Sequence, residues 1–301
     1  MSRRVIGEGG RSLILTNLEK DLYPSYGFTK AQIIDYYRRI APFILPHTKD
    51  RALTLKRYPG GTDQIFFFEK RCPVHRPDWV QTAEVQRNDR EKMTACLINN
   101  METLIWSQNL ASLELHLPLH RAGLPGTPNA MVFDLDPGYP ADVLSCAKVA
   151  LILRDLLADL GLASFVKTSG RKGLHVYVPL NRKKASYAGT RTFSKAVALI
   201  LQKSYPDLVT AKMAKNFRRA KVFINWSQND ASKTMICVYS LRAGERPLVA
   251  VPLAWPELET STAAGDPEKL KFLPSEAISR TEKEGDLFRE VLTKKQVLPY
   301  L

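Results

Sequence analysis

The sequence predicts a mixed α/β protein, because strand and helix patterns alternate through its 301 residues. Short β-branched and aromatic runs bounded by Gly and Pro indicate strands, and longer runs with apolar positions at helical spacing indicate amphipathic helices. The second half contains four such strands, at 131–136, 164–168, 174–178 and 221–226, and two helices, at about 141–160 and 188–203. This β-α-β-β-α-β order predicts a small sheet backed by helices on one face.

The first half contains a helix with a clear start. Thr29 and Gln32 have the spacing of a capping box, in which two side chains satisfy free backbone N–H groups. Apolar residues then recur at helical period, and Pro46 is expected to end the helix. The chain has no internal repeat, low-complexity tract or long Ser/Gly linker, so we expect it to fold as one unit.

A hairpin and a second helix are predicted next. Two alternating runs between Trp79 and Ile98 flank the polar segment 87–90, which indicates a hairpin with a basic tip. Residues 101–117 have an apolar stripe that includes Trp106 and Leu113, so a helix is expected there.

The charge balance favours a polyanionic partner. Forty-four Lys and Arg residues against thirty Asp and Glu give a net charge of +14 and a pI near 9.6. Such an excess favours nucleic acid through phosphate contacts, although a soluble protein can also simply be basic. No apolar run approaches the roughly 20 residues of a membrane span, and the N-terminus lacks the apolar core of a secretory signal.

The four cysteines are widely scattered, at Cys72, Cys96, Cys146 and Cys237, with no C-x-x-C pair. This spacing argues against a zinc site and against a disulfide framework. We therefore expect a reducing, cytoplasmic location.

The first candidate site is the carboxylate pair Asp134 and Asp136. Residues i and i+2 of a strand point to the same face, so the two carboxylates would project together and Leu135 would point into the core. Two close like charges repel one another unless a cation lies between them, and Mg²⁺ or Mn²⁺ suits such a site. The alternative is two exposed aspartates in a turn. A D-x-D pair also occurs in sugar-nucleotide transferases.

The second candidate site is the turn 169–175. Gly170 and Gly173 permit a tight turn whose backbone N–H groups could face an anion. Ser169 and Lys172 could add a hydroxyl donor and a charge for a triphosphate, with His175 on the following strand. In isolation, a basic hairpin turn is the better explanation of this segment.

Two further groups of polar and aromatic residues stand out. The strand ending at Asn225 continues into Ser227 and Gln228, which is unusual for a buried strand unless these groups serve a site. Its alternative is an edge strand whose polar end meets solvent. Near the N-terminus, the segments 56–58 and 66–70 interleave aromatics with cations, as a base-stacking surface would. Core burial is the commoner explanation for at least one of the three consecutive phenylalanines.

Taken in order, six segments resemble the polymerase domain of bacterial ligase D, in the archaeo-eukaryotic primase superfamily. The segments are 16–24, 67–70, 113–116, 132–138, 168–175 and 222–229. The resemblance implies a primase-polymerase core with an RRM-like sheet and an N-terminal α/β lobe. A single domain would comprise an N-terminal lobe at about 1–125, a metal-binding lobe at about 126–255 and a C-terminal helical extension at about 256–301.

The implied activity is template-dependent addition of NTP or dNTP to a primer 3′-hydroxyl, with two Mn²⁺ or Mg²⁺ ions, in non-homologous end joining or gap repair. The implied partners are DNA with 5′-phosphorylated gaps, breaks or overhangs, together with Ku and a DNA ligase. The implied location is the cytoplasm, in association with the nucleoid.

The matching motifs also imply roles for single residues. The metals would be held by Asp134 and Asp136. The incoming nucleotide would be contacted by Ser169, Lys172, His175 and Arg242, with His116 and Gln228 nearby. A downstream 5′-phosphate would be bound by Asn17, Lys20 and Lys30. DNA contacts would come from Arg57, Phe67, Phe68 and Arg218, the last of these in a mobile loop, and the hairpin tip 87–90 would guide an overhang.

One position departs from the family pattern. Where the family has a third metal-binding aspartate, this sequence has Asn225. A carboxamide keeps the shape but loses the charge, so we expect nucleotide and DNA binding to survive while turnover is impaired. Asp230 is five residues further on and would point to the opposite face of a strand.

Two alternatives to a polymerase remain open. A catalytically weak module that binds or bridges DNA ends would explain the charge and Asn225, but it does not need Asp134 and Asp136. A sugar-nucleotide glycosyltransferase would use the D-x-D pair, but it does not need the basic surface.

Overall fold

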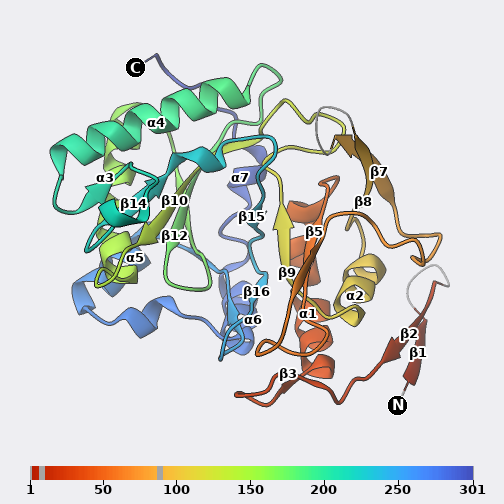
Figure 1. Cartoon of the computed structure of the whole chain (residues 1–301). Helices are drawn as coiled ribbons and strands as arrows, with labels where there is room; N and C mark the ends of the chain where they lie inside the picture. Colours follow the sequence, from red (N-terminus) through yellow and green to blue (C-terminus); the bar gives the residue numbers. More distant parts are fainter. Residues whose placement is uncertain (1, 7–10, 87–90, 301) are drawn as a thin grey trace. The chain divides into compact units, whose positions relative to one another are not determined.

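The computed structural model describes residues 2–6, 11–86 and 91–300, and its fold is mixed α/β, as the sequence predicts (Figure 1). The chain divides into two compact units. Unit 1 comprises Met1–Gly123, Thr234–Val249 and Leu273–Gly285, and unit 2 comprises Leu124–Lys233, Ala250–Phe272 and Asp286–Leu301. The arrangement of three consecutive lobes within one domain stays a prediction. In the described part of the chain, every helix is too short or too polar to span a lipid bilayer.

Unit 2 is built on a six-stranded sheet. In spatial order its strands are β13 (Val209–Thr210), β14 (Val222–Asn225), β10 (Ala130–Pro137), β12 (Leu174–Pro179), β11 (Phe165–Thr168) and β18 (Pro252–Leu253). All neighbouring strands are antiparallel except β13 and β14, which are parallel. Strand β10 pairs with β12 on one side and β14 on the other, so its residues are held in fixed register from both edges.

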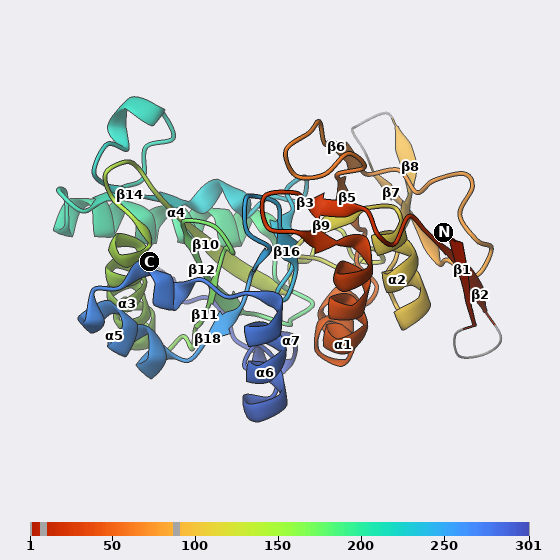
Figure 2. The same cartoon turned by 90° about the horizontal axis from the view of Figure 1, so that it is seen from below.

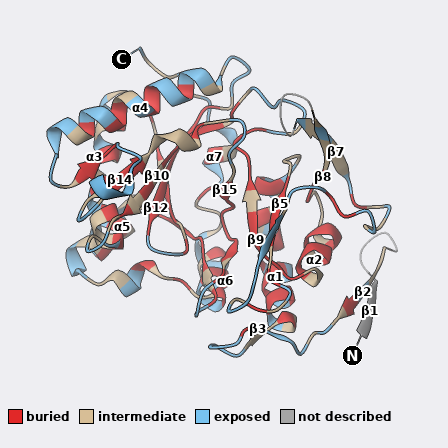
Figure 3. Ribbon diagram, viewed as in Figure 1, coloured by how far each residue is buried: buried red, intermediate tan, exposed pale blue. Residues whose placement is uncertain are grey.

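Unit 2 also contains helices and 3₁₀ turns. They are α3 (Val143–Asp159), α4 (Tyr187–Ser204), α5 (Trp255–Ala264) and α7 (Glu290–Thr293), with 3₁₀ turns η2 (Lys215–Phe217), η3 (Trp226–Gln228) and η4 (Pro267–Leu270). Asp142 caps α3, because its side chain accepts a hydrogen bond from the Ser145 N–H at 2.9 Å. The helix packs on β10 and β12, and α5 packs on α3 (Figure 2). Figure 3 shows β10 and β12 as mostly buried and one side of α4 as exposed.

Unit 1 contains a four-stranded sheet in the order β15 (Met235–Ile236), β9 (Ser112–Leu117), β5 (Thr54–Arg57) and β6 (Phe67–Glu69). Two-stranded pairs are β1 (Ser2–Ile6) with β2 (Ser12–Thr16), β3 (Asp21–Tyr23) with β4 (Phe28–Thr29), β7 (Thr82–Gln86) with β8 (Lys92–Cys96), and β16 (Leu241–Arg242) with β17 (Leu248–Val249). The helices are α1 (Lys30–Thr48), α2 (Met101–Asn109) and α6 (Pro274–Glu284). Although they are far apart in sequence, α1 and α6 lie side by side and are linked by an ion pair between Arg39 and Glu282 at 3.0 Å (Figure 2).

The structure confirms some predicted boundaries and corrects others. The capping box of Thr29 and Gln32 is present, and β7 and β8 form the predicted hairpin, although its tip at 87–90 lies outside the described residues. Helix α1 does not end at Pro46 but continues to Thr48, because His47 and Thr48 are buried in unit 1. The predicted helix 101–117 is also wrong in its second half, where strand β9 follows a break at Ala111, whose φ is +57°.

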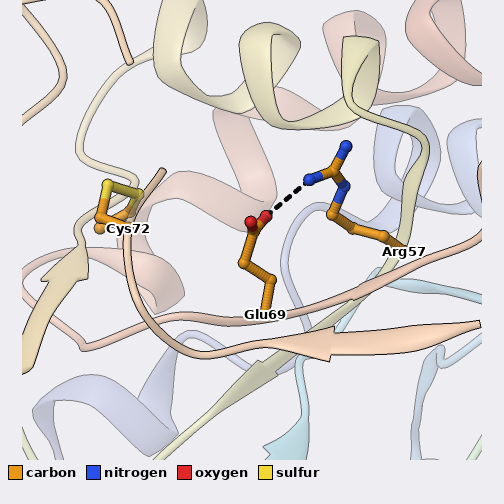
Figure 4. Close-up of a disulfide and its surroundings, with 4 residues drawn as sticks. Arg57, Glu69 and Cys72 are labelled. Carbon is orange, nitrogen blue, oxygen red and sulfur yellow. Dashed lines mark hydrogen bonds and ion pairs between the residues drawn. A yellow bond between two sulfur atoms is a disulfide. The ribbon is translucent and has the colours of Figure 1, made fainter. Parts of the chain in front are cut away.

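The cysteine prediction needs correction as well. Cys72 and Cys96 form a disulfide in unit 1, where Cys72 follows β6 and Cys96 ends β8 (Figure 4). The backbone brings them together, since the Cys72 N–H donates to the Thr94 carbonyl at 2.8 Å. Cys146 and Cys237 are buried and belong to no disulfide. The prediction failed because a pairing across 24 residues depends on this strand contact rather than on local spacing.

Candidate active site and phosphate pocket

The carboxylates of Asp134 and Asp136 project from the same face of β10, while Leu135 between them is fully buried. Burial raises the pKa of Asp136, and the nearby charge of Asp134 raises it further. Lys172 and Arg218 oppose this rise, and the Arg218 Nη1 lies 3.9 Å from Asp136 Oδ2. The pair therefore has the charge repulsion that a bound cation would relieve.

Asp134 is held by side chains from both neighbouring strands. In the sheet register it faces His175 on β12 and Asn225 on β14. His175 Nε2 lies 3.3 Å from Asp134 Oδ1, and Asp134 Oδ2 accepts from Asn225 Nδ2 at 3.1 Å and from Gln228 Nε2 at 3.3 Å. Burial alone would raise the pKa of Asp134, but these donors, with His175 first, lower it. Asp134 is therefore fixed as a carboxylate.

Asn225 occupies the third position of this cluster as a hydrogen-bonding amide. Its Nδ2 donates to Asp134, and its Oδ1 accepts from the Ser227 hydroxyl at 2.7 Å. In the described residues, no group of three or more His, Cys, Asp and Glu side chains could hold a metal ion. Asp134 and Asp136 still offer the carboxylate oxygens that Mg²⁺ or Mn²⁺ prefers, so the residues present fit one divalent ion better than two.

The turn between β11 and β12 carries two further predicted residues, Ser169 and Lys172, and the charge of Lys172 acts on Asp136. Gly170 has a φ of +69°, and a Cβ on Gly173 would lie 2.3 Å from the Leu135 carbonyl oxygen, so both positions require glycine. The Ser169 hydroxyl oxygen accepts from the Arg171 and Gly173 N–H groups at 3.2 and 3.1 Å. Lys172 Nζ donates to the Pro137 carbonyl at 3.5 Å. For an anion, the turn thus offers the Ser169 hydroxyl proton and Lys172 rather than a row of unused backbone N–H groups.

Asn229, which follows β14 and η3, stabilises the fold rather than the site. It is fully buried, and its side chain accepts from the Val132 N–H at 2.9 Å and donates to the Val132 carbonyl at 2.7 Å. It also donates to Ser194 on α4 at 3.0 Å. These bonds satisfy its amide and tie the end of this segment to β10 and α4.

A second polar cluster, in unit 1, surrounds Glu114 on β9. Its carboxylate lies 2.9 Å from His116 Nε2, 3.3 Å from Arg242 Nη1 and 3.8 Å from Lys56 Nζ. Burial would raise the pKa of Glu114, but the His116 hydrogen bond and these cations lower it to about 2. Burial lowers the pKa of His116. Two predicted nucleotide contacts, His116 and Arg242, therefore meet at a carboxylate that the sequence reasoning missed. The available signal was the pair Glu114 and His116, which alternates with three leucines on β9 and is mostly buried all the same.

The predicted 5′-phosphate residues Asn17, Lys20 and Lys30 line one cavity of about 170 Å³ in unit 1. Arg57, predicted as a separate DNA contact, lines the same cavity. Lys30 Nζ donates to the Thr16 carbonyl at 2.7 Å. Its pKa falls to about 8 through burial and through the nearby charges of Lys20 and Arg57. The cavity thus concentrates positive charge, which an anion would relieve.

Arg57 is oriented by contacts on both sides. Its Nε donates to the Leu110 carbonyl at 2.8 Å, and its Nη1 lies 2.9 Å from Glu69 Oε2 (Figure 4). Its guanidinium also lies 5.0 Å from the ring centroid of Phe67. These contacts orient the Arg57 side chain and leave its other terminal nitrogen, Nη2, for a ligand in the cavity.

The three consecutive phenylalanines alternate in side as the chain enters β6. Phe66 and Phe68 pack on each other at 5.8 Å between centroids, and Lys56 Nζ lies 3.8 Å from the Phe66 centroid. Phe67 lies on the other side, against Arg57. All three are between 44% and 55% exposed, so the expectation that at least one is buried is wrong.

Sequence and structure comparisons place this chain in a family. A model of the LigD primase-polymerase domain matches residues 29–288. The chain is 41% identical over 285 residues to the multifunctional non-homologous end joining DNA repair protein LigD of Mycobacterium tuberculosis, covering 92% of this chain and 36% of that protein. It is 32% identical over 287 residues to the bifunctional LigD of Bacillus subtilis, covering 95% of this chain and 45% of that protein. The chain thus spans less than half the length of these curated relatives.

A solved structure agrees with the sequence matches. The polymerase domain from Mycobacterium tuberculosis ligase D, in complex with DNA, superposes with a TM-score of 0.87 and 40% identity, covering 94% of this chain and 99% of that chain. These matches confirm the resemblance seen in the six sequence segments. The chain belongs to the LigD primase-polymerase domain family.

Proposed function

We propose that this chain is a template-dependent nucleotidyltransferase that adds NTP or dNTP to a primer 3′-hydroxyl at DNA gaps or breaks. The observation that supports this most strongly is the pair Asp134 and Asp136 on one face of β10, with Lys172 beside Asp136. A divalent ion bound there would supply charge stabilisation for phosphoryl transfer. Such a reaction depends on positioning and electrostatics, which fixed side chains on a paired central strand can provide.

Each side chain around the pair has a role in this proposal. Asp134 and Asp136 hold Mg²⁺ or Mn²⁺. Lys172 and the Ser169 hydroxyl bind the triphosphate of the incoming nucleotide, and His175 keeps Asp134 in its ionised, fixed orientation. Gln228 donates to the same carboxylate and restricts its rotation. Contacts to the nucleotide by His116 and Arg242 remain predictions.

The cavity around Lys30 binds a 5′-phosphate on the downstream DNA strand. Lys20, Lys30 and Arg57 supply positive charge, and Asn17 supplies an amide donor. Phe67 and Phe68 are exposed enough to stack on bases beside it. The solved relative in complex with DNA supports a DNA ligand for this chain. Action with Ku and a DNA ligase, in the cytoplasm beside the nucleoid, completes the proposal.

Asn225 lowers the turnover of this chain. The Asn225 amide donates a hydrogen bond to Asp134. A carboxylate at position 225 would instead repel the Asp134 carboxylate, and the two would together bind a cation. Asp230 does not supply the missing charge, because it pairs with Arg191 at 3.1 Å and accepts from the Ser232 hydroxyl at 2.7 Å. We therefore expect binding of DNA and nucleotide without efficient extension.

The test is single-nucleotide addition to a gapped duplex with a downstream 5′-phosphate, in Mn²⁺. The chain as given, Asn225→Asp and Asp230→Asn would be compared, with DNA binding measured for each. We expect all three to bind, and Asn225→Asp to extend the primer at least about ten-fold faster than the others. Equal extension by all forms would overturn the role of position 225. Tight, 5′-phosphate-dependent binding without extension by any form would favour the end-binding module instead.

A further inference from the structure

A strongly basic loop precedes β14 in unit 2. Between Lys212 and Lys221 five residues are basic and none is acidic. Almost the whole segment is exposed, and Phe217 at its centre is 46% exposed. An exposed aromatic ring within a run of cations is typical of nucleic-acid surfaces, because bases stack on the ring while the cations contact phosphates.

The base of this loop is fixed to the turn that follows the carboxylates. The Gly138 N–H donates to the Lys221 carbonyl at 2.9 Å, and the Ala220 N–H donates to the Tyr139 carbonyl at 3.2 Å. A Cβ on Gly138 would lie 1.9 Å from the Arg218 carbonyl oxygen, so the backbones are in close contact. The loop is therefore positioned directly beside Asp136.

Its cations fall into two groups. Arg218 and Lys221 point back to the protein: the Arg218 guanidinium lies 3.8 Å from the Phe223 centroid, and Lys221 Nζ donates to the Pro206 carbonyl at 2.6 Å.

The other three cations, Lys212, Lys215 and Arg219, are exposed and form no ion pair with any described residue. Lys212 Nζ lies 4.2 Å from the Phe217 centroid, so a cation lies beside this exposed ring.

Tyr139 adds a second aromatic ring to this surface. It belongs to the turn that carries the loop, and its side chain is 88% exposed. Tyr139 lies three residues after Asp136, and so exposed a ring contributes little to the packing of unit 2. Together, Tyr139, Phe217 and the three outward cations form what we name the loop platform.

We propose that the loop platform binds the DNA strand whose 3′-hydroxyl is extended. Phe217 stacks on a base near the primer end, and Lys212, Lys215 and Arg219 contact the phosphates behind it. The primer is the strand that must reach Asp134 and Asp136, and the platform is joined to Asp136 through its own backbone and Arg218. This inference rests on the proposed function.

Binding of a recessed primer–template without a downstream strand tests the platform, because no 5′-phosphate then occupies the Lys30 cavity. Fluorescence anisotropy would be measured in the Asn225→Asp background, followed by primer extension. We expect Phe217→Ala to weaken binding about ten-fold and Phe217→Trp to restore it. The triple change Lys212→Ala, Lys215→Ala and Arg219→Ala should reduce the magnitude of the slope of log affinity against log salt by about 3. In extension, the KM for primer should rise with little change in kcat.

Matched controls lie elsewhere on unit 2. Tyr205→Ala removes another exposed aromatic ring, and the triple change Arg182→Ala, Lys183→Ala and Lys184→Ala removes an equal exposed charge. If both control variants weaken binding as much as the loop variants, net charge explains the binding and the inference is overturned. If Asn225→Asp extends primers and the loop variants bind and extend like it, the inference alone is overturned. If Asn225→Asp extends no primer, the proposed function fails and this inference fails with it.

Discussion

Two regions of the molecule bring like charges together, the carboxylate pair of Asp134 and Asp136 in unit 2 and the cation cavity around Lys30 in unit 1. In the carboxylate site a neutral residue, Asn225, donates to Asp134 at the position where the family resemblance implies a third acid. The cation cavity contains no such replacement, and its crowding appears as a Lys30 pKa lowered to about 8. With Asn225, the carboxylate site has less negative charge for binding a cation than a third acid would give it. The cation cavity retains the positive charges of Lys20, Lys30 and Arg57 for binding an anion.

This difference between the two regions predicts that DNA binding and nucleotide addition respond to different substitutions. A cavity that keeps its cations should still bind a phosphate, whereas a metal site with two carboxylates should hold a divalent ion weakly. Asn225 should also relieve repulsion in the apo protein, so unit 2 is expected to be more stable than its Asn225→Asp form. The following changes act on one region at a time.

The largest effect is expected from Asp134→Asn in the Asn225→Asp background. Loss of this carboxylate removes the ligand that His175, Gln228 and the sheet register hold in place, so extension should fall by about 10³-fold. Primer extension in Mn²⁺ measures this, with binding to 5′-phosphorylated DNA as the control that should not change. Extension within ten-fold of the parent would mean that the chemistry lies elsewhere.

Removal of the Cys72–Cys96 disulfide should have an intermediate effect, on the stability and phosphate binding of unit 1. Cys72 lies three residues after Glu69, which orients Arg57 in the cation cavity (Figure 4). Replacing Cys72 and Cys96 by Ser should lower the free energy of unfolding by about 3 kcal/mol, given a loop of 24 residues. It should also weaken 5′-phosphate binding.

Thermal denaturation and DNA binding measure these two consequences. Cys146 and Cys237 are buried outside the disulfide, and replacing them by Ser provides the control for Cys-to-Ser substitution, which should leave 5′-phosphate binding unchanged. A disulfide-free variant with unchanged phosphate binding would show that the β6 segment positions Arg57 without the disulfide.

The smallest effect is the pH dependence of the cation cavity. Because the folded pKa of Lys30 is about 8, its charge is lost as pH rises above that value, and the preference for a 5′-phosphate should fall by up to ten-fold per pH unit. Stability should move the other way. The unfolded chain binds more protons than the folded one between about pH 8 and pH 10.5, so unfolding free energy should rise with pH there. Lys30→Arg should remove both trends, and a Lys30→Arg profile that matches the parent would contradict this assignment.

Local patterns were enough to predict the carboxylate site. Asp134 and Asp136 alternate with buried residues on one strand, and the Gly-bounded turn around Lys172 follows the next strand, so sequence order already placed them at one sheet. The helix at 101–117 failed because Trp106 and Leu113 fit a helical stripe, while the left-handed residue Ala111 starts a strand instead.

Contacts between distant segments could not be predicted. Glu114 meets Lys56 and Arg242 only because β9 pairs with β5 and packs near β16, and Arg57 reaches the Lys30 cavity through its neighbours Glu69 and Leu110. Their sequence separations give no local periodicity. The family resemblance implied roles for Arg242 and Arg57, but their partners Glu114, Glu69 and Leu110 became visible only in the fold.

Titration with Mn²⁺ tests the central claim most directly, because it measures the metal site without DNA or turnover. Mn²⁺ binding would be followed by calorimetry for the chain as given and for Asn225→Asp, with 5′-phosphate binding measured on the same samples. We predict that Asn225→Asp binds Mn²⁺ at least about ten-fold more tightly, while 5′-phosphate affinity is the same in both forms. Equal Mn²⁺ affinity in the two forms would contradict the account of position 225.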